Sequence, residues 1–432
     1  METPVFLRSL FLSITLSFTD YILFASHRKL QTVQSVLLYA MVLTLLTFHL
    51  ISFFIFFALF GVVIVLYSAQ KNTPVIFHSP TKESEELSTH LSLTPFQLSP
   101  FLCDGALQTI TVFLTKYPKN MSFTRRMVTG FDGGEFAVDW LDCQDTLPTT
   151  SPVIIIFHGL AGGSRESYVR RFADAANKEG YRVCVYTYRG CAGTLMKTPR
   201  AYNVTCLEDT ETVISHVHQI YIESQIFLVG YSMGGMIVTS VLGRLEHLKE
   251  KCNLAGIVAV SSTWNSLSSS EYIPSAFMKG FTESLVKISK KNKNVFERAM
   301  KEGRIKLFDF GLMDYVKNIA TFDKNFDCKI FGFGNNETYY SDIEQWYHLL
   351  PQSNIPFLAI NAFDDPIAII PDVTLGRIKN AVSVSKNVIF VVTNNGGHLG
   401  WEEKGKGITF VDKTTLEYFN ALLGSNNKGV TK

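Results

Sequence analysis

Residues Ile226–Met236 read IFLVGYSMGGM and place a single serine, Ser232, between glycines directly after four apolar residues. Glycine tolerates sharp turns and close backbone approach. A serine at the centre of G-x-S-x-G, between a buried strand and a helix, is the pattern of a nucleophile elbow. A glycine-rich turn that merely contains a serine is the alternative. The pattern therefore needs partners elsewhere in the chain.

Length and composition bound the classes of protein to consider. The chain has 432 residues, enough for one large domain or two ordinary ones, and its net charge of +2 gives no nucleic-acid signal. Seven cysteines are scattered without C-x-x-C spacing, which indicates neither a zinc site nor a dense disulfide framework and leaves one or two disulfides open. They are Cys103, Cys143, Cys184, Cys191, Cys206, Cys252 and Cys328.

The apolar residues gather near the N-terminus. Between Gln31 and Gln70 there is no Asp, Glu, Lys or Arg. About 20 apolar residues cross a bilayer as a helix, so this stretch predicts one long, tilted membrane span over about residues 36–67. A hairpin of two spans is less favoured, because no Gly or Pro lies between Gln31 and Gly61. The apolar core is also too long for the alternative of a cleaved signal peptide.

The residues around the span indicate an orientation. Basic residues before the span exceed those after it, where acidic residues soon follow, which favours a cytosolic N-terminus and a type II orientation. Those before it are Arg8, Arg28 and Lys29, and those after it are Lys71 and Lys82. Residues 6–25 are also apolar but carry charges, so they are expected to form an interfacial helix or a poor second span. The choice between endoplasmic reticulum and plasma membrane stays open.

The rest of the chain reads as a linker followed by an α/β domain. Residues 71–100 are polar and contain proline, which predicts a linker, and Thr124–Asp142 has Asp-Gly-Gly between two alternating runs, which predicts a β-hairpin. Continuous apolar runs alternating with helical segments then predict a mostly parallel central sheet with helices on both faces, over residues 101–425. These runs are Val153–Gly159, Arg182–Gly190, Ile226–Gly230, Gly256–Ser262, Phe357–Asp365 and Val388–His398. Residues 263–350 interrupt the pattern and are expected to form an inserted lid.

A serine nucleophile needs an imidazole to take its proton and a carboxylate to orient that imidazole. On this fold both should follow the serine, each just past a later strand. Asp365 ends the run FLAINAFDD, and His398 lies in NNGGHLGW after the last strand. Asp364 is adjacent to Asp365; Asp365 is favoured as the acid because it precedes a Pro-containing turn, which Asp364 could cap.

The same chemistry needs two backbone N–H donors for the oxyanion. Met233, the residue after the nucleophile, is expected to supply one, and Leu160, in the loop after the first central strand, the other. Gly230 and Gly234 flank the elbow and allow its turn. His158 is expected to shape the loop, and His216 and His218, in a helical run, to have surface or packing roles.

Six ordered motifs together resemble the α/β-hydrolase superfamily, and more narrowly its membrane-anchored α/β-hydrolase-domain-containing group of lipases and esterases (AB hydrolase family 4). They are HGLAGGSRESYVR, YRGCAGT, TPRAYN, GYSMGG, NAFDDP and GGHLGW, and the resemblance spans about Phe101 to Leu423. It implies the α/β-hydrolase fold, a triad of Ser232, Asp365 and His398, ester hydrolysis on lipid-like substrates and one N-terminal signal anchor. Two features depart from the pattern: TWNSL after the run GIVAVSS, and the additional apolar segment 6–25.

No cofactor or metal is expected. YRGCAGT lacks the glycine and lysine spacing of a phosphate-binding loop, no His or Cys cluster has metal-ligand spacing, and a serine triad needs neither. Three functions are weighed. A membrane-bound serine hydrolase of acylglycerol or phospholipid esters leads, followed by a small-ester carboxylesterase or an acyltransferase. The third is a non-catalytic lipid-binding or receptor protein, against which the complete triad argues. The sequence leaves the acyl chain, the headgroup and the oligomeric state open.

Overall fold

The computed structural model describes residues 28–69, 72–99, 102, 104–115, 121–142, 146–265, 272–305, 309–403 and 407–429. The chain divides into two compact units, Met1–Tyr67 and Ser68–Lys432. The predicted interfacial segment, residues 6–25, lies outside the described residues.

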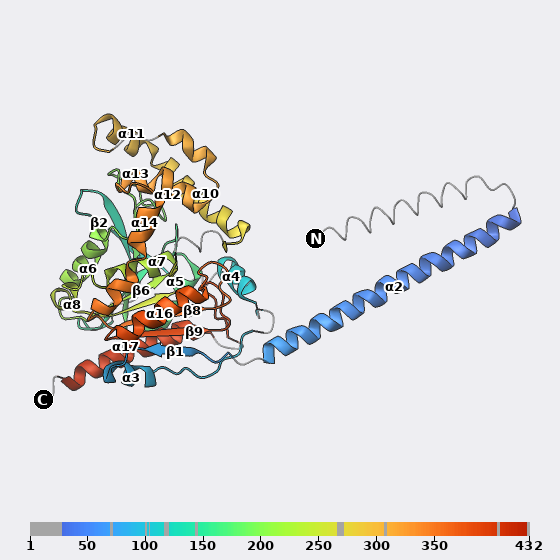
Figure 1. Ribbon diagram of the computed structural model, residues 1–432, viewed down its shortest axis with the longest axis horizontal. Helices are drawn as coiled ribbons and strands as arrows, with labels where there is room; N and C mark the ends of the chain where they lie inside the picture. The colour runs from blue at the N-terminus through green and yellow to red at the C-terminus, as the bar shows by residue number, and fades with distance from the viewer. Residues whose placement is uncertain are drawn as a thin grey trace. The chain divides into compact units, whose positions relative to one another are not determined.

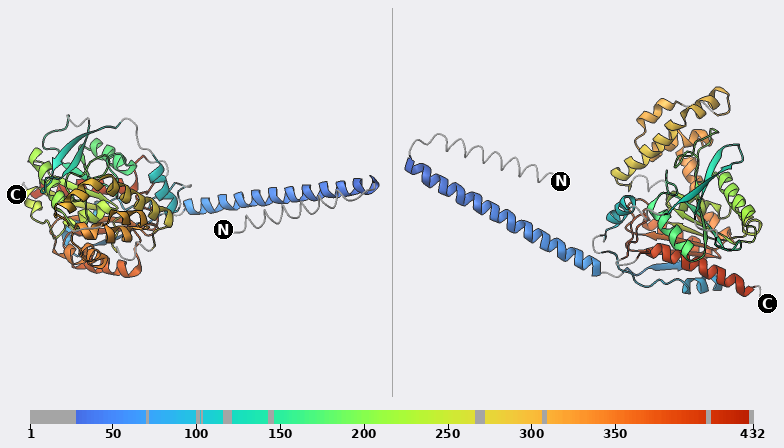
Figure 2. Two further views of the ribbon diagram at one scale, coloured as in Figure 1. Left: turned by 90° about the horizontal axis from the view of Figure 1, so that it is seen from above. Right: turned by 180° about the vertical axis from the view of Figure 1, so that it is seen from behind.

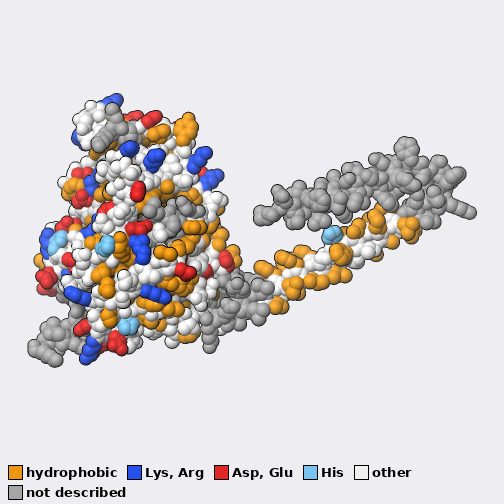
Figure 3. Space-filling model, viewed as in Figure 1, with side chains coloured by type: hydrophobic (Ala, Val, Ile, Leu, Met, Phe, Trp, Pro, Cys, Tyr) orange, Lys and Arg blue, Asp and Glu red, His pale blue; other side chains and the backbone are white. Residues whose placement is uncertain are grey.

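Helix α2, Arg28–Ala69, contains all the described residues of the first unit. Within it, Val36–Val62 is long and apolar enough to cross a membrane, by length and composition. Figure 3 shows hydrophobic side chains along the visible face of this helix. The threonines here satisfy their hydroxyls internally, as Thr47 does by donating to the Leu43 carbonyl at 2.9 Å. The helix is continuous, so the alternative of a two-span hairpin is not seen in residues 28–69.

The second unit is built on a sheet whose described strands have the order β1-β9-β8-β7-β6-β4-β5-β3-β2 (Figure 1). The strands from β9 to β5 in that order pair in parallel, and β1, β3 and β2 extend the two edges in antiparallel pairs. The predicted mostly parallel sheet and the predicted hairpin, now β2 and β3, are confirmed. The bounds are β1 Val75–His78, β2 Phe123–Thr129, β3 Glu135–Leu141, β4 Val153–Phe157, β5 Arg182–Thr187, β6 Ile226–Tyr231, β7 Leu254–Val260, β8 Phe357–Ala362 and β9 Val388–Thr393.

Helices cover both faces of this sheet, as predicted (Figure 2). Successive strand residues point to opposite faces, so Ile155 of β4 packs into one core cluster and Ile154 into the other. The first cluster contains side chains of α6, α7 and α16, and the second those of α5 and α17. The bounds are α5 Ser167–Lys178, α6 Glu208–Ile220, α7 Met233–Val241, α8 Leu248–Lys251, α16 Asp372–Val384 and α17 Phe410–Gly429.

The stretch expected to be a linker, residues 71–100, is instead part of the folded unit. Within it, β1 pairs with β9 and is followed by α3, Lys82–Thr89. Farther along, Phe96 stacks on Phe410 of α17 at 4.5 Å between ring centroids. Strand β1 is only four residues long, and backbone pairing at a sheet edge does not depend on a distinctive side-chain pattern. Helix α4, Gly105–Leu114, follows before the hairpin.

The insertion between β7 and β8 is helical and has its own apolar core, formed by side chains such as Leu285, Phe296 and Phe322. Its described elements are α10 Ser275–Lys291, α11 Lys293–Lys301, η1 Phe310–Tyr315, α12 Ile319–Asn325, α13 Asp327–Ile330, α14 Asn336–Ile343, α15 Trp346–Leu349 and η2 Leu350–Gln352. Its action as a lid stays a prediction.

Candidate active site

Ser232 lies at the junction of β6 and α7 in a backbone conformation that side-chain-bearing residues rarely adopt, with φ 56° and ψ −119°. The left-handed φ therefore falls on the serine and not on the flanking glycines. Those glycines are needed for a different reason. A Cβ on Gly230 would lie 2.2 Å from the Gly234 carbonyl oxygen, and one on Gly234 would lie 2.2 Å from the Phe157 carbonyl oxygen. The elbow thus depends on β6, α7 and β4 touching backbone to backbone.

The structure brings Ser232, His398 and Asp365 into one hydrogen-bonded chain. His398 Nε2 lies 2.8 Å from Ser232 Oγ, and His398 Nδ1 lies 2.8 Å from Asp365 Oδ2. A carboxylate oxygen only accepts, so Nδ1 carries the proton and Nε2 is left to accept from the serine hydroxyl. His398 and Asp365 are almost fully buried, whereas Ser232 is partly exposed. This is the geometry that makes a serine hydroxyl nucleophilic.

The two adjacent aspartates hold different groups. Asp365 Oδ1 accepts from the N–H groups of Ile367 and Ala368, each at 2.8 Å, which fixes the carboxylate that faces His398. The Asp364 carboxylate accepts from Gly397 N at 2.8 Å, so it holds the turn that presents His398. The structure places Asp365, the favoured candidate, against the imidazole.

The loop after β4 runs directly beside the serine. A Cβ on Gly159 would lie 3.5 Å from Ser232 Cβ. His158 is buried, and burial lowers its pKa to about 4, so its ring is neutral at physiological pH. Its Nδ1 donates to the Gly159 carbonyl oxygen at 2.7 Å, while the Tyr168 hydroxyl accepts from Gly159 N at 2.8 Å. His158 therefore lies where it shapes this loop.

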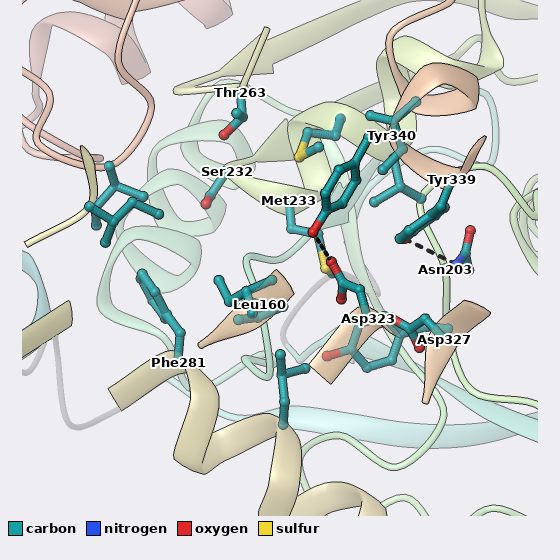
Figure 4. A pocket seen from close by; sticks show the side chains of 18 residues that line it. Leu160, Asn203, Ser232, Met233, Thr263, Phe281, Asp323, Asp327, Tyr339 and Tyr340 are labelled. Carbon is teal, nitrogen blue, oxygen red and sulfur yellow. Dashed lines mark hydrogen bonds between the residues drawn. The ribbon is translucent and has the colours of Figure 1, made fainter. Parts of the chain in front are cut away.

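The residues expected to supply the oxyanion donors, Leu160 and Met233, line a cavity together with Ser232 (Figure 4). Met233 is the first residue of α7, where helix N–H groups lack intrahelical acceptors. A second cavity, also lined by Ser232 and Leu160, contains His398. His216 and His218 lie in α6 and line neither cavity. Among the described residues no group of three or more His, Cys, Asp or Glu is placed to hold a metal ion.

The cavity in Figure 4 is mostly apolar but contains a pair of carboxyl groups from the insertion, those of Asp323, which is buried, and Asp327, which is half-buried. The Tyr340 hydroxyl donates to Asp323 Oδ2 at 2.7 Å. Burial raises the pKa of Asp323 to about 7, although hydrogen bonds from Tyr340 and Asp327 lower it. Burial, and then the charge of Asp323, raise the pKa of Asp327 well above its ordinary value. The pair is therefore protonated where free aspartates are ionised.

The sequence did not single out this pair, nor the α4 residue Thr109, whose Oγ1 accepts from His398 N at 2.8 Å. For Thr109 a signal exists, because it and Gln108 are polar residues inside the apolar run GALQTITVFL. For the aspartates there is none, since burial in a distant helical insertion is not encoded in local spacing.

Comparisons with known proteins show the family of the chain. Residues 152–405 match the family described as the alpha/beta hydrolase fold. The chain is 29% identical over 322 residues to human phospholipase ABHD3, covering 72% of this chain and 75% of that protein. It is 31% identical over 326 residues to an abhydrolase domain-containing protein of Dictyostelium discoideum, covering 72% and 78%. With the monoacylglycerol lipase of Saccharomyces cerevisiae it shares 27% identity over 273 residues, covering 59% and 56%.

Among solved structures, an esterase of Pyrococcus furiosus is similar, with a TM-score of 0.40 and 18% identity over 65% of this chain and 83% of that chain.

The carboxyl pair generates a prediction about stability and pH. An aspartate whose folded pKa is raised binds a proton that the unfolded chain releases, so its stabilising contribution is complete below about pH 4 and is lost as pH rises to about 7. The loss is at most about 1.4 kcal/mol per pH unit for one proton. Asp327→Asn removes one titrating group, so we expect a smaller fall in the thermal unfolding midpoint between pH 4.5 and 8.

A matched control is Asp314→Asn, since Asp314 lies in the same insertion and its side chain is 65% exposed. That variant should keep the slope of the unsubstituted chain. Parallel curves for Asp327→Asn and the unsubstituted chain would show that Asp327 does not bind a proton that the unfolded chain releases.

Proposed function

Because this chain belongs to the α/β-hydrolase family, we propose that it is a serine hydrolase that cleaves carboxylic esters of lipids. The hydrogen-bonded chain of Ser232, His398 and Asp365 beside an apolar cavity carries the proposal. The fold alone hosts many functions. The triad geometry is what points to acyl transfer rather than to another chemistry.

The mechanism follows from which atom holds each proton. Ser232 Oγ attacks the ester carbonyl carbon as its proton passes to His398 Nε2, and Asp365 stabilises the imidazolium that forms. The N–H groups of Leu160 and Met233 bind the oxyanion. His398 then protonates the leaving alcohol as the C–O bond breaks, which leaves an acyl-serine. Water loses a proton to His398 Nε2 and attacks the acyl carbon; the bond from that carbon to Ser232 Oγ then breaks, His398 returns the proton to Oγ, and the carboxylic acid leaves.

Lipid substrates are favoured by the lining of the cavity and by the relatives. Side chains such as Met236, Phe281 and Leu285 supply an apolar wall next to Ser232, suited to an acyl chain. Two of the similar proteins are named as a phospholipase and a monoacylglycerol lipase. An apolar helix in the same chain would keep the enzyme beside its substrate.

The first prediction from the proposed function concerns the nucleophile. Membranes containing the chain are expected to react with a fluorophosphonate probe, and Ser232→Ala should abolish labelling and lower ester hydrolysis about 10⁶-fold. Labelling that persists in Ser232→Ala would refute the nucleophile, and no labelling of the unsubstituted chain would refute the enzyme. A panel of monoacylglycerols, phospholipids and short-chain esters measures the substrate class. Hydrolysis confined to short soluble esters would replace the lipid proposal with that of a small-ester carboxylesterase.

The second prediction separates the two aspartates. Asp365→Asn leaves the imidazole in the wrong tautomer, so we expect kcat to fall about 10³- to 10⁴-fold. Asp364→Asn keeps one of the two acceptor oxygens that hold Gly397 and Asn395 in the turn before His398, and it keeps the triad, so we expect a fall of about tenfold or less, the loss typical of one hydrogen bond. The two kcat values measured on one ester are the test. An equal or larger loss in Asp364→Asn would reverse the assignment.

The third prediction concerns topology. We propose that the span holds the N-terminus in the cytosol and the catalytic unit on the other side, because Arg8, Arg28 and Lys29 precede it. In sealed microsomes, added protease should remove an N-terminal epitope tag and leave the catalytic unit intact. Digestion of the catalytic unit with the tag protected would contradict this orientation.

A further inference from the structure

Helix α4 has the reverse of the pattern expected of a surface helix. A surface helix normally buries its apolar residues and exposes its polar ones. In α4 the buried positions include the polar residues Gln108 and Thr109, and the exposed positions are apolar. The exposed side chains are Leu107 at 46%, Ile110 at 42%, Phe113 at 47% and Leu114 at 74%. This face suits an apolar medium better than water.

The buried polar face of α4 holds the loop that carries His398. Thr109 Oγ1 accepts from His398 N at 2.8 Å and donates to the Gly105 carbonyl oxygen at 2.6 Å. Gln108 Oε1 accepts from Glu402 N at 3.0 Å. A Cβ on Gly105 would lie 2.0 Å from the Asp364 carbonyl oxygen. Helix α4 is therefore held against the catalytic loop by its polar face, with its apolar residues turned outward.

The exposed face is continuous with the entrance to the site. Ile110, Phe113 and Leu114 line the cavity that also contains Ser232 and His398. Across that cavity, Phe277 of α10 faces Phe113 with 6.4 Å between ring centroids. An apolar rim thus leads from the surface of α4 to the candidate nucleophile.

We propose that the exposed face of α4 inserts into the surface of the bilayer, so that lipid enters the site across it. Three observations favour lipid over a protein partner. A protein seated on this face would cover the entrance to Ser232, whereas lipid supplies the substrate. The ten residues of α4 carry no charge, so the helix offers nothing for charged complementarity. Only residues 70 and 71 lie between Ala69, the end of α2, and Asn72, which pairs with Phe96 in the catalytic unit.

This inference rests on the proposed lipid hydrolysis, and its test reports contact with lipid independently of activity. The full chain is placed in phosphatidylcholine nanodiscs with a bimane fluorophore on Leu107→Cys, a position outside the cavity lining. The matched control is Ile222→Cys, 69% exposed and just before β6, at the opposite end of that strand from Ser232. The unsubstituted chain, treated in the same way, corrects for the native cysteines.

A doxyl nitroxide on the lipid acyl chain should quench the label at position 107 at least about twofold more than the label at position 222, and aqueous iodide should show the opposite preference. Equal quenching by iodide at both positions would overturn the proposal. A label at position 107 that is shielded from both quenchers would also overturn it, because a protein would then cover the helix.

Activity gives a second readout. Leu107→Gln should lower hydrolysis of lipid in the nanodisc about five- to tenfold and leave hydrolysis of a soluble short-chain ester unchanged, while Ile222→Gln changes neither. Equal loss of both activities in Leu107→Gln would indicate a structural role for Leu107 and count against the proposal. If the unsubstituted chain cleaves neither substrate, the proposed function fails, and the quenching result still decides whether α4 contacts lipid.

Discussion

At the elbow the backbones of β4, β6 and α7 are in direct contact, and the positions of the reacting groups depend on that contact. Gly230 and Gly234 permit it because any side chain there would collide with a neighbouring carbonyl group. The left-handed backbone conformation of Ser232 costs about 1–3 kcal/mol. One of the contacts that hold it is the hydrogen bond from Ser232 N–H to the Val260 carbonyl oxygen, at 2.8 Å. The same contact sets the distance from Ser232 to the end of β4, where the loop containing Leu160 begins.

His398 depends on a different set of supports, drawn from distant parts of the chain. Asp364 and Thr109 of α4 each accept a hydrogen bond from the loop that carries His398. Four residues after His398, Glu402 pairs with Arg171 of α5 at 3.2 Å. Arg171 also pairs with Asp412 of α17 at 2.5 Å. Arg171 and Asp412 are both buried, and losing one partner of a buried ion pair typically costs about 3–5 kcal/mol. Helices α5 and α17, which pack on the same face of the sheet, are thus tied to each other and to the segment that follows His398.

Local pattern predicted most of the sheet, because buried parallel strands such as Val153–Phe157 are continuous apolar runs between helical segments. The order of Ser232, Asp365 and His398 along those strands led to the same three residues that the structure brings together. Predictions from the sequence pattern were wrong or missing where contacts between residues far apart in the chain determine the structure. Strand β1 is four residues long and is defined only by pairing with β9, so its segment read as a linker. The carboxyl pair of Asp323 and Asp327 depends on how the insertion folds over the cavity. The pattern indicated that glycines would make the turn at the elbow, but the left-handed residue is Ser232 itself.

The central claim is that Ser232 becomes acylated during turnover, and trapping that intermediate tests it most directly. The full chain would be mixed with excess of an activated acyl ester, quenched with acid within milliseconds to seconds, digested and analysed by mass spectrometry. The account predicts a single acyl adduct on the peptide that contains Ser232, formed before steady-state product release and absent after prior reaction with a fluorophosphonate. Product formation with no adduct on that peptide, or an adduct on another residue, would contradict it.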